Sequence, residues 1–113
     1  MVDILIVEDN KEIAGLLCDF LRAENYIVSV AYNGARAIEL FNKYGAKLVL
    51  LDIMLPGIDG FSVCSKIREE SNTPILIVSA KSEKEDKIKG LNLGADDYIE
   101  KPYDMDILIA QIK

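Results

Sequence analysis

Five short apolar runs recur along the chain, and segments with helical periodicity separate them. The runs occupy residues 4–7, 27–31, 48–51, 75–78 and, more weakly, 98–99. Their hydrophobicity is continuous rather than alternating, which is typical of strands that are buried on both faces. The alternation of strand and helix predicts an α/β fold: a doubly wound, five-stranded parallel sheet with helices on both faces.

Helical periodicity predicts which residues of three intervening segments face the sheet. The stripe expected to be buried in the first segment consists of Ile13, Leu16, Leu17, Phe20 and Leu21. The corresponding residues of the next two segments are Ala37, Leu40, Phe41 and Tyr44, then Val63, Cys64 and Ile67.

Capping residues indicate where four of the helices begin. Asn10, Asn33 and Asp104 each stand where a side-chain oxygen can accept hydrogen bonds from the first turn of a following helix. Ser82 and Glu85 have the spacing of a capping box. Each of these signals comes a few residues after an apolar run, as the strand and helix pattern requires.

The composition fits one ordinary domain. The chain has 113 residues, 50% of them hydrophobic, and no apolar run approaches the roughly 20 residues that cross a membrane. The start, MVDILIVEDN, lacks the basic region, apolar core and cleavage site of a secretory signal. We therefore expect a single domain over residues 1–113, in the cytoplasm and without membrane contact. Cys18 and Cys64 are expected to be reduced thiols in the core.

Charge and residue usage exclude several functions. The net charge is -6, so this chain is not expected to bind nucleic acid by itself. Histidine is absent, which excludes histidine triads, histidine metal ligands and histidine acid–base catalysis. The chemistry that remains is that of carboxylates, hydroxyls and lysine.

Polar residues follow four of the five runs. They are Glu8, Asp9, Asp52, Ser79 and Lys101. Taken singly, each fits a turn, a cap or an exposed loop position. However, the carboxyl ends of parallel strands meet at one edge of a sheet, which is where α/β proteins bind ligands. Their joint placement therefore favours one functional site.

Three carboxylates at one sheet edge require a cation. At about 4 Å, two such charges repel by roughly 4 kcal/mol at an effective dielectric constant of about 20. An all-oxygen site of this kind suits Mg²⁺, which commonly bridges carboxylates and a phosphoryl group. We therefore expect phosphoryl transfer, with Asp52 as the nucleophile and with Glu8 and Asp9 holding the metal. Lys101 is expected to neutralise one phosphoryl oxygen, and Ser79 to donate a hydrogen bond to another.

Four segments resemble the receiver domain of bacterial two-component response regulators, a flavodoxin-like fold, and the resemblance covers essentially the whole chain. They are ILIVEDN at 4–10, LVLLDIMLPGIDG at 48–60, PILIVSA at 74–80 and GADDYIEKPY at 94–103. The last segment is most similar to the subfamily joined to a winged-helix DNA-binding domain. The resemblance implies the strand order 2-1-3-4-5. It also implies that an effector domain followed Lys113 in the full protein and binds DNA.

The resemblance also implies roles for individual residues. Asp52 would accept a phosphoryl group from the phosphohistidine of a sensor kinase, and Mg²⁺ would bind Glu8, Asp9, Asp52 and the carbonyl of Met54. Lys101, before a cis proline at Pro102, would contact the phosphoryl group. The switch residues would be Ser79 and Tyr98, and the residues that tune dephosphorylation would be Met54 and Lys81. Such a domain is a signalling switch that catalyses only its own phosphorylation and dephosphorylation.

Active receivers of this subfamily form homodimers through the fourth helix, fifth strand and fifth helix. The positions of this face that we single out are Lys87, Asp96, Asp97, Ile107 and Gln111. Ile107 and Gln111 stand where the subfamily usually has Glu and Arg. A half-made set of ion pairs is unfavourable, so we expect a weakened or more apolar dimer contact.

Three other functions compete with the switch. A haloacid-dehalogenase-like phosphohydrolase normally has a second Asp two residues after the nucleophile, whereas position 54 is Met. A pure interaction module would not need all five site residues. A flavodoxin-like cofactor binder would need a Gly-rich or hydroxyl-rich first loop, whereas the loop EDNKE is acidic.

Overall fold

The computed structural model describes residues 1–52, 55, 57, 60–79, 88–89, 91–92, 95, 97–100, 110 and 112, with the backbone alone at 79 and 97–100. Its elements are β1 (Val2–Val7), α1 (Lys11–Ala23), β2 (Val28–Ala31), α2 (Gly34–Tyr44), β3 (Ala46–Leu51), α3 (Gly60–Glu70), β4 (Ile75–Ser79) and β5 (Asp97–Glu100). The five strands form one parallel sheet in the order β2-β1-β3-β4-β5. The predicted fold class and strand order are therefore confirmed.

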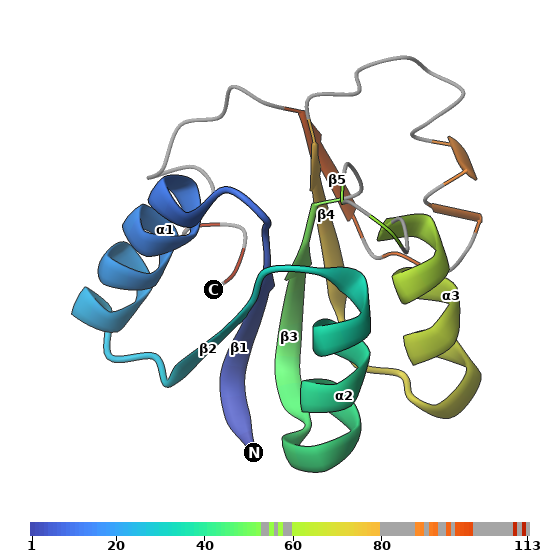
Figure 1. Ribbon diagram of the computed structural model, residues 1–113, viewed down its shortest axis with the longest axis horizontal. Helices are drawn as coiled ribbons and strands as arrows, with labels where there is room; N and C mark the ends of the chain where they lie inside the picture. The colour runs from blue at the N-terminus through green and yellow to red at the C-terminus, as the bar shows by residue number, and fades with distance from the viewer. Residues whose placement is uncertain are drawn as a thin grey trace.

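The helices cover the sheet on both faces. Figure 1 shows α1 on one side of the sheet and α2 and α3 on the other. Residues of β1 alternate between the two sides, because successive side chains of a strand point in opposite directions. Ile4 and Ile6 pack with Leu17 and Leu21 of α1, whereas Leu5 belongs to the cluster beneath α2 and α3. Burial on both faces explains why these strands have continuous apolar sequences.

The buried face of α1 differs from the predicted one. The residues that it buries are Ala14, Leu17, Cys18 and Leu21. Leu16 and Phe20, which we predicted to be buried, are 57% and 44% exposed. Both stripes have helical spacing and share Leu17 and Leu21, so they differ by a rotation of the helix. The small side chains of Ala14 and Cys18 let α1 lie close to the sheet, and a pattern based on large apolar residues overlooks them.

The second helix also departs from prediction at one position. Ala37 and Leu40 are buried and Phe41 is partly buried, as predicted, but Tyr44 is 54% exposed. Tyr44 ends α2, and the Nζ atom of Lys43 lies 5.3 Å from the centroid of its ring. An aromatic ring with a polar tip tolerates water at such a place.

Other predictions for the core and the helix ends are confirmed. In α3 the predicted residues Val63, Cys64 and Ile67 are buried, and Cys18 and Cys64 are both buried and form no disulfide. The side-chain oxygen of Asn10 accepts from the N–H groups of Glu12 and Ile13 at 3.0 and 3.1 Å. Asn33 does the same for Arg36 at 2.8 Å. The capping signals at Ser82, Glu85 and Asp104 lie outside the described residues.

Gly15 lies inside α1, and replacing it with alanine is expected to stabilise the domain. A Cβ atom added at Gly15 would meet nothing within 4 Å, so the change carries no steric cost. Alanine is favoured over glycine in a helix by about 1 kcal/mol, so the free energy of unfolding in urea should rise by about that amount. Gly45→Ala is the matched control. Gly45 has φ 71° and ψ 172°, a region open essentially to glycine alone, so its replacement should destabilise the domain instead.

The side chain of Asp3 in β1 contacts Ile27 and Lys47, and these contacts make part of the folding stability depend on pH. Its pKa is lowered, mainly because the Ile27 N–H donates to Oδ2 at 2.7 Å, with Lys47 Nζ 3.4 Å from Oδ1. A carboxyl group with a lowered pKa stabilises the fold above its unfolded pKa, and this contribution is lost as the pH falls through the folded pKa. We expect the stability difference between wild type and Asp3→Asn to be constant near neutral pH and to shrink below about pH 4. Urea unfolding across this range measures it, and a difference that does not change with pH would contradict the assignment.

Candidate functional site

The ends of β1 and β3 place Glu8 and Asp52 side by side. Val7 and Leu51, the residues before them, are paired in the sheet. The N–H of Glu8 donates to the carbonyl of Ala31, and the N–H of Asp52 donates to the carbonyl of Val7, both at 3.0 Å. Both acids therefore extend the sheet ladder at its carboxyl edge, and their backbones are held by hydrogen bonds rather than left in a loose loop.

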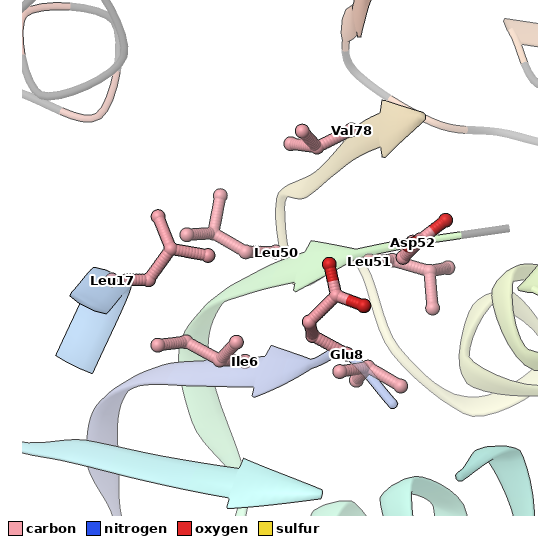
Figure 2. A pocket seen from close by; sticks show the side chains of 8 residues that line it. Ile6, Glu8, Leu17, Leu50, Leu51, Asp52 and Val78 are labelled. Carbon is pink, nitrogen blue, oxygen red and sulfur yellow. The ribbon is translucent and has the colours of Figure 1, made fainter. Parts of the chain in front are cut away.

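Three carboxylates converge at this edge. Oxygen atoms of Glu8, Asp9 and Asp52 all lie within 4.8 Å of one another. Glu8 and Asp52 are only 3% and 7% exposed, whereas Asp9 is exposed. Figure 2 shows Glu8 and Asp52 just past the ends of two neighbouring strands. The predicted grouping of the acidic residues is thus present, with two members buried and the third open to solvent.

Asn10 connects the cluster to the start of α1. Its backbone N–H donates to Oε2 of Glu8 at 3.2 Å, while its side chain caps the helix. Negative charge is favoured near a helix N-terminus because the free N–H groups there carry partial positive charge. Sequence reasoning found the cap but missed the contact with Glu8, since a backbone donor carries no residue-type signal.

Apolar side chains line the space beneath the two buried acids. A cavity of about 10 Å³ lies between Glu8, Asp52, neighbouring residues of the sheet and Leu17 of α1. The apolar residues that line it include Ile6, Leu17, Leu50 and Val78, and Figure 2 shows them around the two acids. This volume holds about one water molecule. Restricted water access strengthens electrostatic interactions at Glu8 and Asp52.

The donor set fits a divalent metal ion. The three side chains offer only carboxylate oxygens, the hard ligands that Mg²⁺ prefers, and Mg²⁺ usually keeps several waters beside one or two carboxylates. Exposure at Asp9 leaves one side of the cluster open to such waters and to a substrate. The residues present therefore suit Mg²⁺ better than a metal that needs nitrogen or sulfur ligands.

The structure tests other predicted site residues only through the backbone. Ser79 ends β4 and is paired with Glu100 of β5, the residue before Lys101, while Tyr98 is paired with Ile77. The side chains of Ser79, Asp97 and Tyr98 are not described. The remaining predicted site and interface residues lie outside the described part of the chain; they are Met54, Lys81, Lys87, Asp96, Lys101, Pro102, Ile107 and Gln111.

A parallel α/β domain with helices on both faces of the sheet and carboxylates at the ends of β1 and β3 is the architecture of a receiver. The chain belongs to the response regulator receiver domain family, whose model matches residues 4–113. Response regulator ArlR of Staphylococcus aureus (strain Mu50) is 45% identical over 113 residues, which are 100% of this chain and 52% of ArlR. The chain thus spans about half the length of the curated relatives it matches.

Solved structures agree with this assignment. A two-component response regulator from Clostridium difficile superposes with a TM-score of 0.96 at 33% identity, over 100% of this chain and 93% of that one. The BeF3-activated N-terminal receiver domain of Klebsiella pneumoniae RstA gives 0.93 at 35% identity, over 97% and 94%. No helix in the described part of the chain is long and apolar enough to span a membrane.

Proposed function

We propose that this receiver domain is a cytoplasmic phosphorylation switch in which Asp52 accepts a phosphoryl group from a sensor histidine kinase. The observation that carries the proposal is the cluster of Glu8, Asp9 and Asp52 at the carboxyl edge of the sheet. Mg²⁺, bound by these carboxylates, would neutralise charge on the phosphoryl oxygens during transfer.

The surroundings of Asp52 suit an acceptor carboxylate. Its backbone N–H is held by the carbonyl of Val7 at 3.0 Å, so the side chain leaves a fixed point of the sheet. The residue is 7% exposed, so most of its surface is in contact with the protein rather than with bulk water. Glu8 is held in turn by the N–H of Asn10 at 3.2 Å. Positioning of this kind lowers the barrier to transfer, because the reacting groups need little further ordering.

The rest of the machinery is proposed from the family. The carbonyl of Met54 would complete the metal site, Lys101 and Ser79 would contact the phosphoryl oxygens, and Ser79 would signal to Tyr98. Lys81, with Met54, would tune dephosphorylation. The pairing of Ser79 with Glu100 supports this, because it brings the end of β4 beside the residue preceding Lys101.

The activity that the phosphorylation switch controls would lie in a second domain. The match to about half of ArlR supports a receiver over residues 1–113 that is attached to a DNA-binding effector. Phosphorylation would favour pairing through the face that contains Lys87, Asp96, Asp97, Ile107 and Gln111. Because Ile107 and Gln111 replace charged residues, that dimer would be weak or more apolar than is usual for the subfamily.

Intact mass spectrometry tests the proposal directly. The domain is incubated with acetyl phosphate and Mg²⁺, and a second sample contains a chelator instead of the metal. Gain of one phosphoryl group only in the presence of metal is the expected result. A folded domain that gains no mass and does not hydrolyse acetyl phosphate would instead be an interaction module. Sustained hydrolysis of unrelated phosphate esters would favour a phosphohydrolase.

A further inference from the structure

A groove runs between α1 and the edge of the sheet, and its lining shares no residue with the acidic cluster. Its volume is about 440 Å³, in the range of ligand sites. The residues that line it are Ala14, Gly15, Cys18, Asp19 and Arg22 of α1, Val28, Ser29 and Val30 of β2, and Tyr32, the residue that follows β2. Figure 1 shows α1 and β2 on the same side of the molecule.

The strand that borders this groove has an open edge. Among the residues that the structure describes, β2 is the terminal strand of the sheet and is paired on one side, with β1. The carbonyls of Ile27 and Ala31 accept hydrogen bonds from β1, and backbone groups alternate in direction along a strand. The N–H and C=O groups of Val28 and Val30 therefore point away from β1. An edge with such groups is a template for another strand.

Arg22 already forms a hydrogen bond with one of these outward-pointing groups. Its Nη2 donates to the carbonyl of Val28 at 3.4 Å, a long and therefore weak hydrogen bond. An arriving strand can replace this donor with a backbone N–H. The guanidinium would then be released to pair with a carboxylate of the incoming chain.

Cations stand at both ends of the groove. Arg22 lies near the beginning of β2, and Lys11 lies at the other end, where its Nζ is 5.4 Å from the centroid of the Tyr32 ring. Asp19 lies between them, so two cations flank one carboxylate although the whole chain has a net charge of -6. The eleven helical steps from Lys11 to Arg22 cover about 16 Å, the length of about five extended residues.

We propose that the open edge of β2 and this groove form a docking site for an extended, acidic segment of a partner protein, which adds to the sheet as a sixth strand. Carboxylates about five residues apart in that segment would meet Arg22 and Lys11. Gly15 keeps the middle of the groove open, since an added Cβ there would meet nothing within 4 Å. Main-chain hydrogen bonds would supply part of the affinity, and the end charges would supply selectivity.

Charge disfavours a second copy of this chain as the occupant. Two β2 strands paired antiparallel about a twofold axis would bring Lys11 of each copy to the Arg22 end of the other. Like charges would then meet at both ends of the interface, whereas an acidic segment meets opposite charge at both.

The test uses a blocked six-residue peptide with glutamate at each end and alternating valine and threonine between. Backbone amide shifts and exchange rates are followed by NMR during titration. We expect the amides of Val28 and Val30 to shift and to exchange more slowly, with a dissociation constant of about 1 mM or tighter. The same peptide with lysine at each end should bind about tenfold more weakly, because two attractions become repulsions.

Two variants locate the binding. Arg22→Glu should weaken binding of the glutamate peptide by about tenfold, whereas Arg36→Glu on α2 is the matched control and should have little effect. Gly15→Leu fills the groove and should abolish binding, whereas Gly15→Ala should bind nearly as wild type does. Both substitutions at Gly15 favour the helix, so loss of fold is not expected.

Three outcomes would overturn the proposal. They are equal binding of the two peptides, shifts confined to other elements, and no binding at a concentration of several millimolar. Sedimentation of the free domain adds a fourth, because a dimer that protects the Val28 and Val30 amides would make a second copy the occupant. None of these measurements depends on phosphorylation, so the outcome is separate from that of the proposed switch.

Discussion

Asp52→Asn is expected to abolish phosphorylation by acetyl phosphate while making the metal-free domain more stable. Asparagine cannot act as the acceptor nucleophile, so the gain in mass should disappear completely. The same change removes one of three carboxylates that lie within 4.8 Å of one another. Removing part of that repulsion should raise the free energy of unfolding by about 1 kcal/mol, and more at low ionic strength.

The metal should reverse this gain. If Glu8, Asp9 and Asp52 hold Mg²⁺ together, wild type gains stability as the metal is added, by an amount that grows with metal concentration relative to its dissociation constant. Asp52→Asn offers one carboxylate fewer and should gain less. Urea unfolding with and without Mg²⁺ measures both effects. Asp19→Asn is the matched control, because it is the same substitution at an exposed position of α1 outside the cluster.

The mass measurement tests Asp52 as the phosphoryl acceptor, and the unfolding measurements test Asp52 as a metal ligand. Phosphorylation that persists in Asp52→Asn would place the acceptor on another residue. A variant that loses phosphorylation but shows the same metal response as wild type would keep Asp52 as the nucleophile and remove it from the metal site. Unchanged stability in the absence of metal would mean that the charges of Glu8 and Asp9 are already compensated by neighbouring groups.

The sheet was predictable because its strands are buried on both faces. Runs such as residues 48–51 have no polar residue, so a strand and its approximate ends can be read without knowledge of its partners. The observed strand Ala46–Leu51 begins two residues before this run. It includes Ala46 and the exposed Lys47. Pairing with β1 sets this beginning, since Val2 is aligned with Ala46, and such pairing is not visible in the local sequence.

The acidic cluster was predictable for a related reason. Parallel strands bring residues distant in sequence to one edge, so Glu8 and Asp52 could be placed together once the strands were assigned. The support that Glu8 receives from the Asn10 N–H was not predictable, because any residue except proline offers the same donor. The groove beside β2 was also missed. It depends on where α1 lies relative to the sheet edge, which the periodicity of α1 does not specify.

Leu17→Ala is expected to destabilise the domain far more than Leu16→Ala, although the residues are neighbours and the pattern of large apolar residues treats them alike. Leu17 is 4% exposed and packs among residues of the sheet, so its truncation should cost about 3 kcal/mol through lost burial and a residual cavity. Leu16 is 57% exposed, so its truncation should change the free energy of unfolding by about 0.5 kcal/mol or less. The change in helix propensity is the same for both and cancels in the comparison.

Urea unfolding of the two variants therefore measures the rotation of α1 about its axis. A large loss at both positions would mean that the helix buries the stripe of large residues, and that Ala14 and Cys18 do not face the sheet. A large loss at Leu17 alone would support the closer packing that those two small residues permit. Since Leu17 also lines the space beneath Glu8 and Asp52, its truncation should weaken Mg²⁺-dependent stabilisation as well, whereas Leu16→Ala should leave that stabilisation unchanged.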